Sequence, residues 1–241
     1  MKGTSPIVAA ARAAAVGLLL GACAAEPPAD GQRLPGRFAG DGIAVGLEYA
    51  VVDNAGLAAG MARHYAGTGL TGMKLLGEAS AWGRMQEAPG TPIDFADLDL
   101  FVQSYQDHGF TALTIALKPH SRWGSKDVGL LGAKNASPKP EYREAFAEWV
   151  ARVVERYDGD GLDDMPGLRW PVELFEIGSE FSSYQPEPVA DYLETLEIAY
   201  RAAHEANPAV RIAHAAFLTT PVDLDVAEPD DYEAAWTRTP R

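Results

Sequence analysis

The strongest constraint on the fold is an alternation of short apolar segments with longer segments of helical period. Because each apolar segment is separated from the next by a helix-length stretch, the order β-α-β-α-β-α-β-α-β predicts a parallel sheet with right-handed crossovers. The apolar segments are short and largely uncharged, as expected for parallel strands buried on both faces. The five predicted strands are Ile43–Val52, Met73–Leu76, Thr111–Leu117, Val172–Ile177 and Arg211–Phe217.

Four amphipathic helices are predicted between these strands. The clearest follows Pro140, a residue that suits the first turn of a helix, and carries one continuous apolar stripe. That stripe consists of Tyr142, Phe146, Trp149, Val150, Val153, Val154 and Tyr157. The other three helices are marked by apolar residues three or four positions apart, within Leu57–Tyr65, Leu98–Tyr105 and Val189–Tyr200.

Such a sheet can have two architectures. It can stay open, as in a doubly wound sheet, or it can close into a (β/α)₈ barrel. Doubly wound nucleotide-binding sheets carry a glycine-rich turn between a strand and the following helix. The segment Gly67–Gly72 matches the GxGxxG pattern, but it leaves a predicted helix and enters a predicted strand. No helix amino terminus is then available for a pyrophosphate, so the match does not predict a dinucleotide site.

The charge balance narrows the choice of partners. The 241-residue chain has 20 Lys and Arg against 34 Asp and Glu, a formal net charge of −14. Such a chain repels phosphate backbones, so nucleic acid is not an expected partner, whereas neutral sugars remain open. A single cysteine excludes an internal disulfide and a multi-cysteine metal site. No cofactor is expected.

The acidic segment Asp158–Asp164 resembles a calcium loop only in part. It lacks the glycine at position six and the glutamate at position twelve of an EF-hand. The sequence therefore predicts a solvated acidic loop at the end of the third helix, and no metal site.

The amino terminus predicts export. Lys2 and Arg12 precede a short apolar run, Ala13–Leu20, that is too short to span a bilayer. The residues Leu20-Gly21-Ala22-Cys23 resemble the lipobox of bacterial lipoproteins, with a plain secretory signal as the alternative. The resemblance implies a signal peptide over residues 1–22 and acylation of Cys23. It also implies a membrane anchor that holds the exported protein in the cell envelope, at the outer membrane or cell surface. Residues 23–36 are rich in Pro, Gly and Ala and predict a flexible tether.

The most informative stretch for chemistry is the end of the fourth strand. Within Val172–Phe181 an apolar strand ends at Gly178, and Glu180 follows. In barrel enzymes the catalytic groups lie at the carboxyl ends of the strands. Partial desolvation there would raise the pKa of Glu180 and suit it to donate a proton, although a helix-capping or arginine-bound carboxylate is the structural alternative.

The motif Phe175-Glu176-Ile177-Gly178-Ser179-Glu180 resembles the fourth-strand motif W-E-I-G-N-E of clan A glycoside hydrolases. The resemblance covers roughly residues 40–220. It implies a (β/α)₈ barrel over residues 37–241, retaining hydrolysis of O-glycosidic bonds, and Glu180 as the acid/base. The expected partner is an oligo- or polysaccharide.

Four further residues are expected to bind this substrate. Trp82 follows the second strand, and His120 and Trp123 follow the third, where aromatic rings suit sugar stacking; packing roles are the alternative. Ser179 stands where the clan has an asparagine whose amide contacts the 2-hydroxyl of the sugar.

Retaining cleavage needs a second carboxylate, which this clan takes from the seventh strand. The sequence predicts a barrel truncated after the fifth strand, so the nucleophile is not expected in this chain. The alternative to a hydrolase is a non-catalytic carbohydrate-binding lipoprotein on a degenerate or truncated barrel. A structural envelope protein without a ligand is the third reading.

Overall fold

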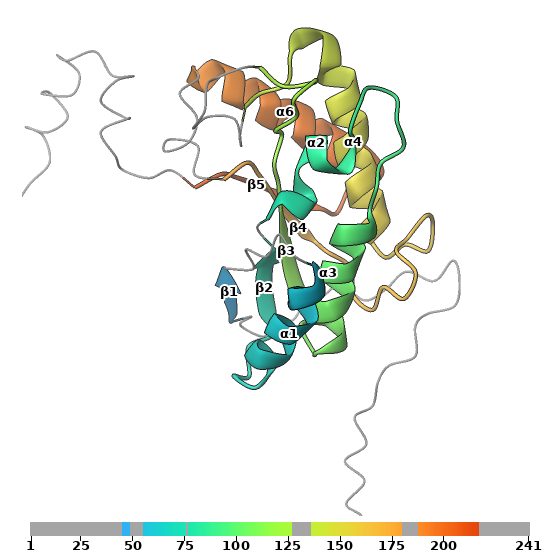
Figure 1. Cartoon of the computed structure of the whole chain (residues 1–241). Coiled ribbons are helices and arrows are strands. Elements are labelled where there is room, and N and C mark those ends of the chain that lie inside the picture. Colours follow the sequence, from blue (N-terminus) through green and yellow to red (C-terminus); the bar gives the residue numbers. More distant parts are fainter. Residues whose placement is uncertain (1–44, 49–54, 76, 127–135, 180–187, 217–241) are drawn as a thin grey trace, which may run out of the picture.

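The five predicted strands form one parallel sheet (Figure 1). The structure, a computed structural model, describes residues 45–48, 55–75, 77–126, 136–179 and 188–216. Neighbours in the sequence are neighbours in the sheet throughout, in the order β1-β2-β3-β4-β5. The strands are β1 (Gly46–Glu48), β2 (Gly72–Leu75), β3 (Ala112–Leu117), β4 (Leu174–Ile177) and β5 (Arg211–His214).

The four predicted helices are also confirmed. They are α1 (Ala55–Ala66), α3 (Ala96–Asp107), α4 (Arg143–Tyr157) and α6 (Val189–Ala206). The predicted first-turn residue Pro140 opens a short 3₁₀ turn, η2 (Pro140–Tyr142), that leads into α4. The sequence did not predict the turn η1 (Glu78–Ser80) or the short helix α2 (Trp82–Met85), which together shape the connection from β2 to α3.

The strand order decides between the doubly wound sheet and the (β/α)₈ barrel. A doubly wound sheet reverses its strand order at a switch point, whereas here every crossover steps in the same direction. Right-handed crossovers that all step one way place every helix on the same face of the sheet. The described strands therefore have the order found in a (β/α)₈ barrel, and Gly67–Gly72 indeed leaves α1 and enters β2.

The hydrophobic core lies between the helices and one face of the sheet. Alternate strand residues such as Met73, Ile115 and Phe175 are fully or almost fully buried there. The predicted stripe of α4 packs against them, and its central residues are completely buried. The core thus follows from the hydrophobic pattern of the sequence, which has a period of two residues along the strands and about 3.6 residues along the helices.

The opposite, inner face of the sheet is built differently. It carries small residues such as Ala112 and Ala116, and polar ones such as Lys74, Thr114 and Glu176. β1 and β2 approach closely at Gly46 and Gly72. A Cβ on Gly46 would therefore lie only 2.8 Å from the Gly72 backbone. The first rung of the sheet therefore requires glycine.

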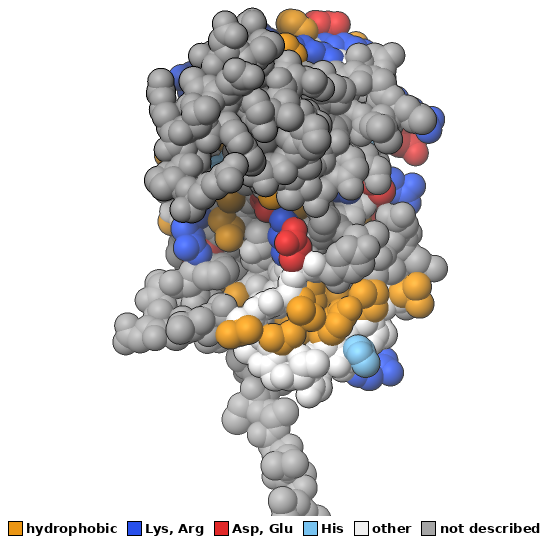
Figure 2. Space-filling model, turned by 90° about the vertical axis from the view of Figure 1, so that its left-hand side faces the viewer, with side chains coloured by type: hydrophobic (Ala, Val, Ile, Leu, Met, Phe, Trp, Pro, Cys, Tyr) orange, Lys and Arg blue, Asp and Glu red, His pale blue; other side chains and the backbone are white. Residues whose placement is uncertain are grey.

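The side of the molecule that carries β1 and α1 shows a band of apolar side chains (Figure 2). Val45, Leu47 and Leu57 are large hydrophobic residues exposed there. Along the part of the chain that the structure describes, no helix combines the length and apolarity needed to cross a bilayer. The predicted signal peptide (1–22), the tether (23–36) and Cys23 lie outside the described residues, and so does Glu180.

Candidate active site

The carboxyl end of β4 is where the predicted catalytic motif leaves the sheet. Gly178 has a φ of 82°, a left-handed conformation that favours glycine, and its amide donates a hydrogen bond to the Leu117 carbonyl of β3 (2.8 Å). The chain thus turns immediately after β4 while it is still bonded to the neighbouring strand. Ser179 follows, half-buried, and is the last described residue before Glu180 in the sequence.

An ion cluster lies on the inner face of the sheet, and two of its three members are largely buried. Lys74 Nζ on β2 lies 2.6 Å from Glu176 Oε2 on β4 and 2.8 Å from Glu48 Oε1 on β1. The side chains of Lys74 and Glu176 are 15% and 12% exposed, whereas that of Glu48 is largely exposed. One ammonium group therefore ties three strands together from the inside.

The cluster contains one ammonium group and two carboxylate groups. Burial alone lowers the pKa of Lys74, but its hydrogen bonds to Glu176 and Glu48 outweigh burial and raise that pKa. Glu176 Oε1 is buried and has no hydrogen-bond partner among the described residues. Two carboxylates facing one ammonium leave a negative balance, so the inner face offers acceptor oxygens that suit the hydroxyl groups of a polyol.

A second ion pair lies at the strand ends. Lys118, directly after β3, donates from Nζ to Glu78 Oε1 at 3.1 Å, and its side chain is almost fully buried. Ser80 donates from its hydroxyl to the Ala116 carbonyl (2.6 Å). These bonds fix the start of the β2–α3 connection against the end of β3.

Trp82 is a core residue. Its side chain has no exposed surface and contacts the rings of Trp123, Phe146 and Trp149. Its Nε1 donates to Gln86 Oε1 (3.0 Å). A ring without exposed surface cannot stack on a sugar, so the stacking role expected for Trp82 does not fit its position.

Trp123 and His120 lie on the connection after β3, and both are partly exposed. The Trp123 Nε1 donates to the Gln86 carbonyl (2.9 Å), and its ring meets Tyr142 edge-on, with centroids 5.2 Å apart. The His120 carbonyl accepts from the Gly83 amide (2.8 Å). Trp123 is thus fixed in position and only partly exposed, and its substrate-binding role remains a prediction.

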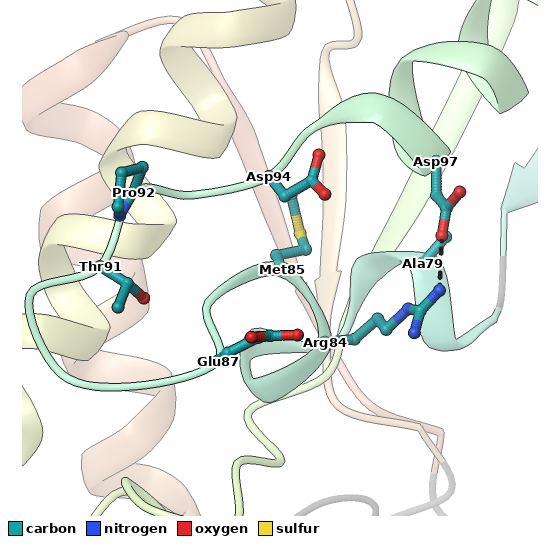
Figure 3. Close-up of a pocket in the computed structure, with 8 residues that line it drawn as sticks. All are labelled: Ala79, Arg84, Met85, Glu87, Thr91, Pro92, Asp94 and Asp97. Atoms are coloured by element: carbon teal, nitrogen blue, oxygen red, sulfur yellow. Dashed lines mark hydrogen bonds and ion pairs between the residues drawn. The ribbon is translucent and has the colours of Figure 1, made fainter.

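A pocket of about 400 Å³ lies on the β2–α3 connection (Figure 3). Its wall carries Arg84 and Asp97, joined by a 3.0 Å ion pair, and the carboxylates of Glu87 and Asp94. The lining residues all fall between 79 and 97, and neither His120 nor Ser179 is among them. The pocket belongs to one loop and is separate from the end of β4.

Sequence reasoning missed Lys74 and Glu176 as members of the site. The available signal was a single charged residue inside each of two otherwise apolar strand segments, Gly72–Leu75 and Leu174–Ile177. A charge inside a buried strand needs a partner, and a barrel provides that partner on the same inner face.

The acidic loop after α4 also differs from its prediction. The sequence predicted a solvated loop, but Asp158 is only 2% exposed. The solvated description is therefore wrong for Asp158, because the carboxylate lies under its own loop rather than in solvent.

No protein-family model matches the chain, and no curated protein matches it. Among solved structures it is similar to a family 39 glycoside hydrolase from the gut symbiont Bacteroides cellulosilyticus WH2, at 20% identity over 70% of this chain and 30% of that one, with a TM-score of 0.49. It is also similar to the endoglucanase Cel5A of Pseudomonas stutzeri, at 16% identity over 77% and 54%, with a TM-score of 0.47. A third is the family 30 subfamily 8 xylanase Xyn30A of Clostridium acetobutylicum, at 13% identity over 85% and 49%, with a TM-score of 0.45. The chain spans between 30% and 54% of the length of these three proteins.

Proposed function

We propose that this chain is a carbohydrate-active protein of the glycoside hydrolase type, with its sugar site at the carboxyl ends of β2, β3 and β4. The observation that carries the proposal is the left-handed turn at Gly178, directly after a β4 that is bonded on both sides in a sequentially ordered parallel sheet. Catalytic groups of barrels occupy this edge of the sheet. In the sequence Glu180 comes two residues after Gly178, which supports Glu180 as the proton donor to the glycosidic oxygen.

The mechanism divides the work between Glu180 and a second carboxylate. Glu180 protonates the leaving oxygen and then, as its conjugate base, activates the water that completes retaining hydrolysis. The buried Lys74–Glu176 pair supports the strand ends from beneath. Ser179, His120 and Trp123 are the proposed sugar contacts, and the nucleophile is proposed to come from a seventh strand, which is not among the described ones.

The proton-donor role is tested with a protein that includes the proposed seventh strand. Two substrates are used per sugar, one with an alkyl and one with a dinitrophenyl leaving group. Glu180→Gln should lower kcat/KM for the alkyl glycoside by about 10²–10⁴-fold. The loss of glycosylation rate should be much smaller for dinitrophenyl, because that leaving group needs no protonation. Glu148→Gln on the exposed side of α4 is the matched control. Equal activity of Glu180→Gln and the control would end the assignment.

A second candidate, non-catalytic carbohydrate binding, is favoured by one observation. The two carboxylates described on the inner face, Glu48 and Glu176, both bind Lys74 and so neither is set apart as a nucleophile. This function predicts oligosaccharide binding by calorimetry without turnover, weakened by Trp123→Ala and unchanged by Tyr200→Ala on the exposed side of α6. Neither binding nor turnover with glucan, mannan and xylan oligosaccharides would contradict both candidates and leave the structural envelope reading.

We also propose that the chain is exported and anchored by acylation of Cys23, on the strength of Leu20-Gly21-Ala22-Cys23 alone. Expression in a bacterium fed an alkyne-tagged fatty acid tests this. The label should appear on the wild-type chain and disappear in Cys23→Ser, while export continues in both. Label retained in the serine variant would overturn the anchor.

A further inference from the structure

The loop between α4 and β4 holds a cluster of carboxylates that the proposed function does not use. Asp158, Asp160 and Asp164 each offer one oxygen to a group whose members all lie within 4.8 Å of one another. The loop enters the amino end of β4, whereas Ser179 follows the carboxyl end of the same strand. The cluster is therefore independent of the candidate active site.

The buried member of this cluster is incompletely bonded. Asp158 is 2% exposed, and its Oδ1 accepts from the Asp160 amide (3.2 Å). Its Oδ2 is buried and has no hydrogen-bond partner among the described residues. A buried carboxylate oxygen without a partner is costly, so the arrangement calls for a cation or a donor at this position.

The rest of the loop orients the other two carboxylates. Asp164 accepts from the amides of Gly159 (3.0 Å) and Gly161 (2.8 Å), and Asp160 accepts from Leu162 (2.8 Å). Each of these carboxylates retains lone pairs, because a carboxylate can accept about four hydrogen bonds. The loop is therefore folded around its own acidic groups.

Two nearby arginines each form an ion pair with an aspartate outside the cluster. Arg156 binds Asp99 on α3 in a two-pronged ion pair, with Nη2 2.6 Å from Oδ2. Arg152 pairs with Asp163, outside the cluster, at 3.2 Å.

We infer that the Asp158–Asp164 loop binds a calcium ion through the carboxylates of Asp158, Asp160 and Asp164. Calcium takes six to eight oxygen ligands at about 2.3–2.6 Å, so oxygens up to about 4.8 Å apart can share one ion. Three carboxylates of a short, irregular loop suit calcium better than magnesium, which demands near-ideal octahedral geometry at about 2.0–2.1 Å. Backbone carbonyls and water complete the shell.

The full chain, freed of metal with a chelator and dialysed, tests this inference by calorimetry and thermal melting. Calcium should bind with a Kd of roughly 10⁻⁵–10⁻³ M and raise Tm by about 3–8 °C. Asp160→Asn should weaken calcium binding at least about tenfold. Asp158→Asn should remove the Tm shift and, without metal, melt no lower than wild type, because it relieves a buried charge.

Asp163→Asn is the matched control: it removes the same charge from the same loop, but Asp163 is exposed and outside the cluster. Its calcium affinity should stay within about threefold of wild type. Absence of calcium binding by the wild-type chain would overturn the inference. Equal binding by Asp160→Asn and Asp163→Asn, or an equal response to magnesium, would also overturn it.

Discussion

Lys74 and Glu176 form a 2.6 Å ion pair across the inner face of the sheet, on strands β2 and β4 with β3 between them. Each belongs to an otherwise apolar strand segment, and each would be an isolated buried charge without the other. The pair therefore couples the placement of two strands that share no hydrogen bonds.

Replacing one member of the Lys74–Glu176 pair should lower the free energy of unfolding more than replacing both. Lys74→Met leaves a buried carboxylate without its cation and should lower the free energy of unfolding by about 3 kcal/mol. The double variant Lys74→Met/Glu176→Gln should recover most of that loss. Urea unfolding measures both values.

The exposed pair Arg84–Asp97 gives the control for this cycle, because its coupling should lie between about 0 and 1 kcal/mol. Equal couplings for the two pairs would contradict the importance of burial.

Alkaline pH should destabilise the chain. Burial raises the pKa of Tyr105 and of Tyr192 to about 12, and the pKa of Lys74 is also raised above its usual 10.5. These groups keep their protons in the folded chain at pH values where the unfolded chain loses them. Their contribution is fully present below about pH 10 and is lost as pH rises toward 12. Urea unfolding at pH 8 to 11 should show an increasingly negative slope, and a flat profile would contradict it.

Tyr192 joins the ends of β4 and β5. Its hydroxyl donates to the Ile177 carbonyl (3.0 Å) and accepts from the Ala215 amide (2.6 Å). Tyr192→Phe leaves both buried backbone groups without this partner and should cost about 1–3 kcal/mol. Tyr200→Phe on exposed α6 should change stability by less than about 0.5 kcal/mol. Similar losses for both variants would argue against the bridge.

Two glycines should respond oppositely to alanine. A Cβ on Gly124 would lie 2.6 Å from Cζ3 of the buried Trp82 ring, so Gly124→Ala should destabilise by at least about 1–3 kcal/mol. A Cβ on Gly60, inside α1, meets nothing within 4 Å. Gly60→Ala should stabilise by about 0.5–1 kcal/mol, because alanine restricts the unfolded chain and favours helix. Thermal melts distinguish the two signs.

The parts of the fold that follow local periodicity could be predicted from the sequence. The stripe from Phe146 to Tyr157 has only one face apolar, so helix α4 and its buried side follow directly. The choice between barrel and doubly wound sheet could not be predicted from these patterns alone, because both share the same element order. The strand pairing decided it.

The candidate site was predicted less completely, because burial depends on contacts between distant segments. Trp82 has the composition expected of a sugar platform, yet its ring is enclosed by Trp149 of α4 and by Gly124, which no local pattern indicates. The sequence also predicted a solvated Asp158, because no local pattern indicates that this residue is buried. The pairing of Lys74 with Glu176 depends on the register of β2, β3 and β4, which becomes known only once the sheet is assembled.

The connections after β2 and β3 are interlocked: the amides of Trp82 and Gly83 bond the carbonyls of Lys118 and His120, and the Trp82 ring fills the space that Gly124 leaves open. In protein engineering these two connections therefore form one cassette. A graft of residues 77–95 from another barrel would bring a foreign side chain against Gly124 and lose the Lys118–Glu78 pair. Recombination that preserves folding has to transfer both connections together, so new specificities at this edge should arise by joint exchange rather than loop by loop.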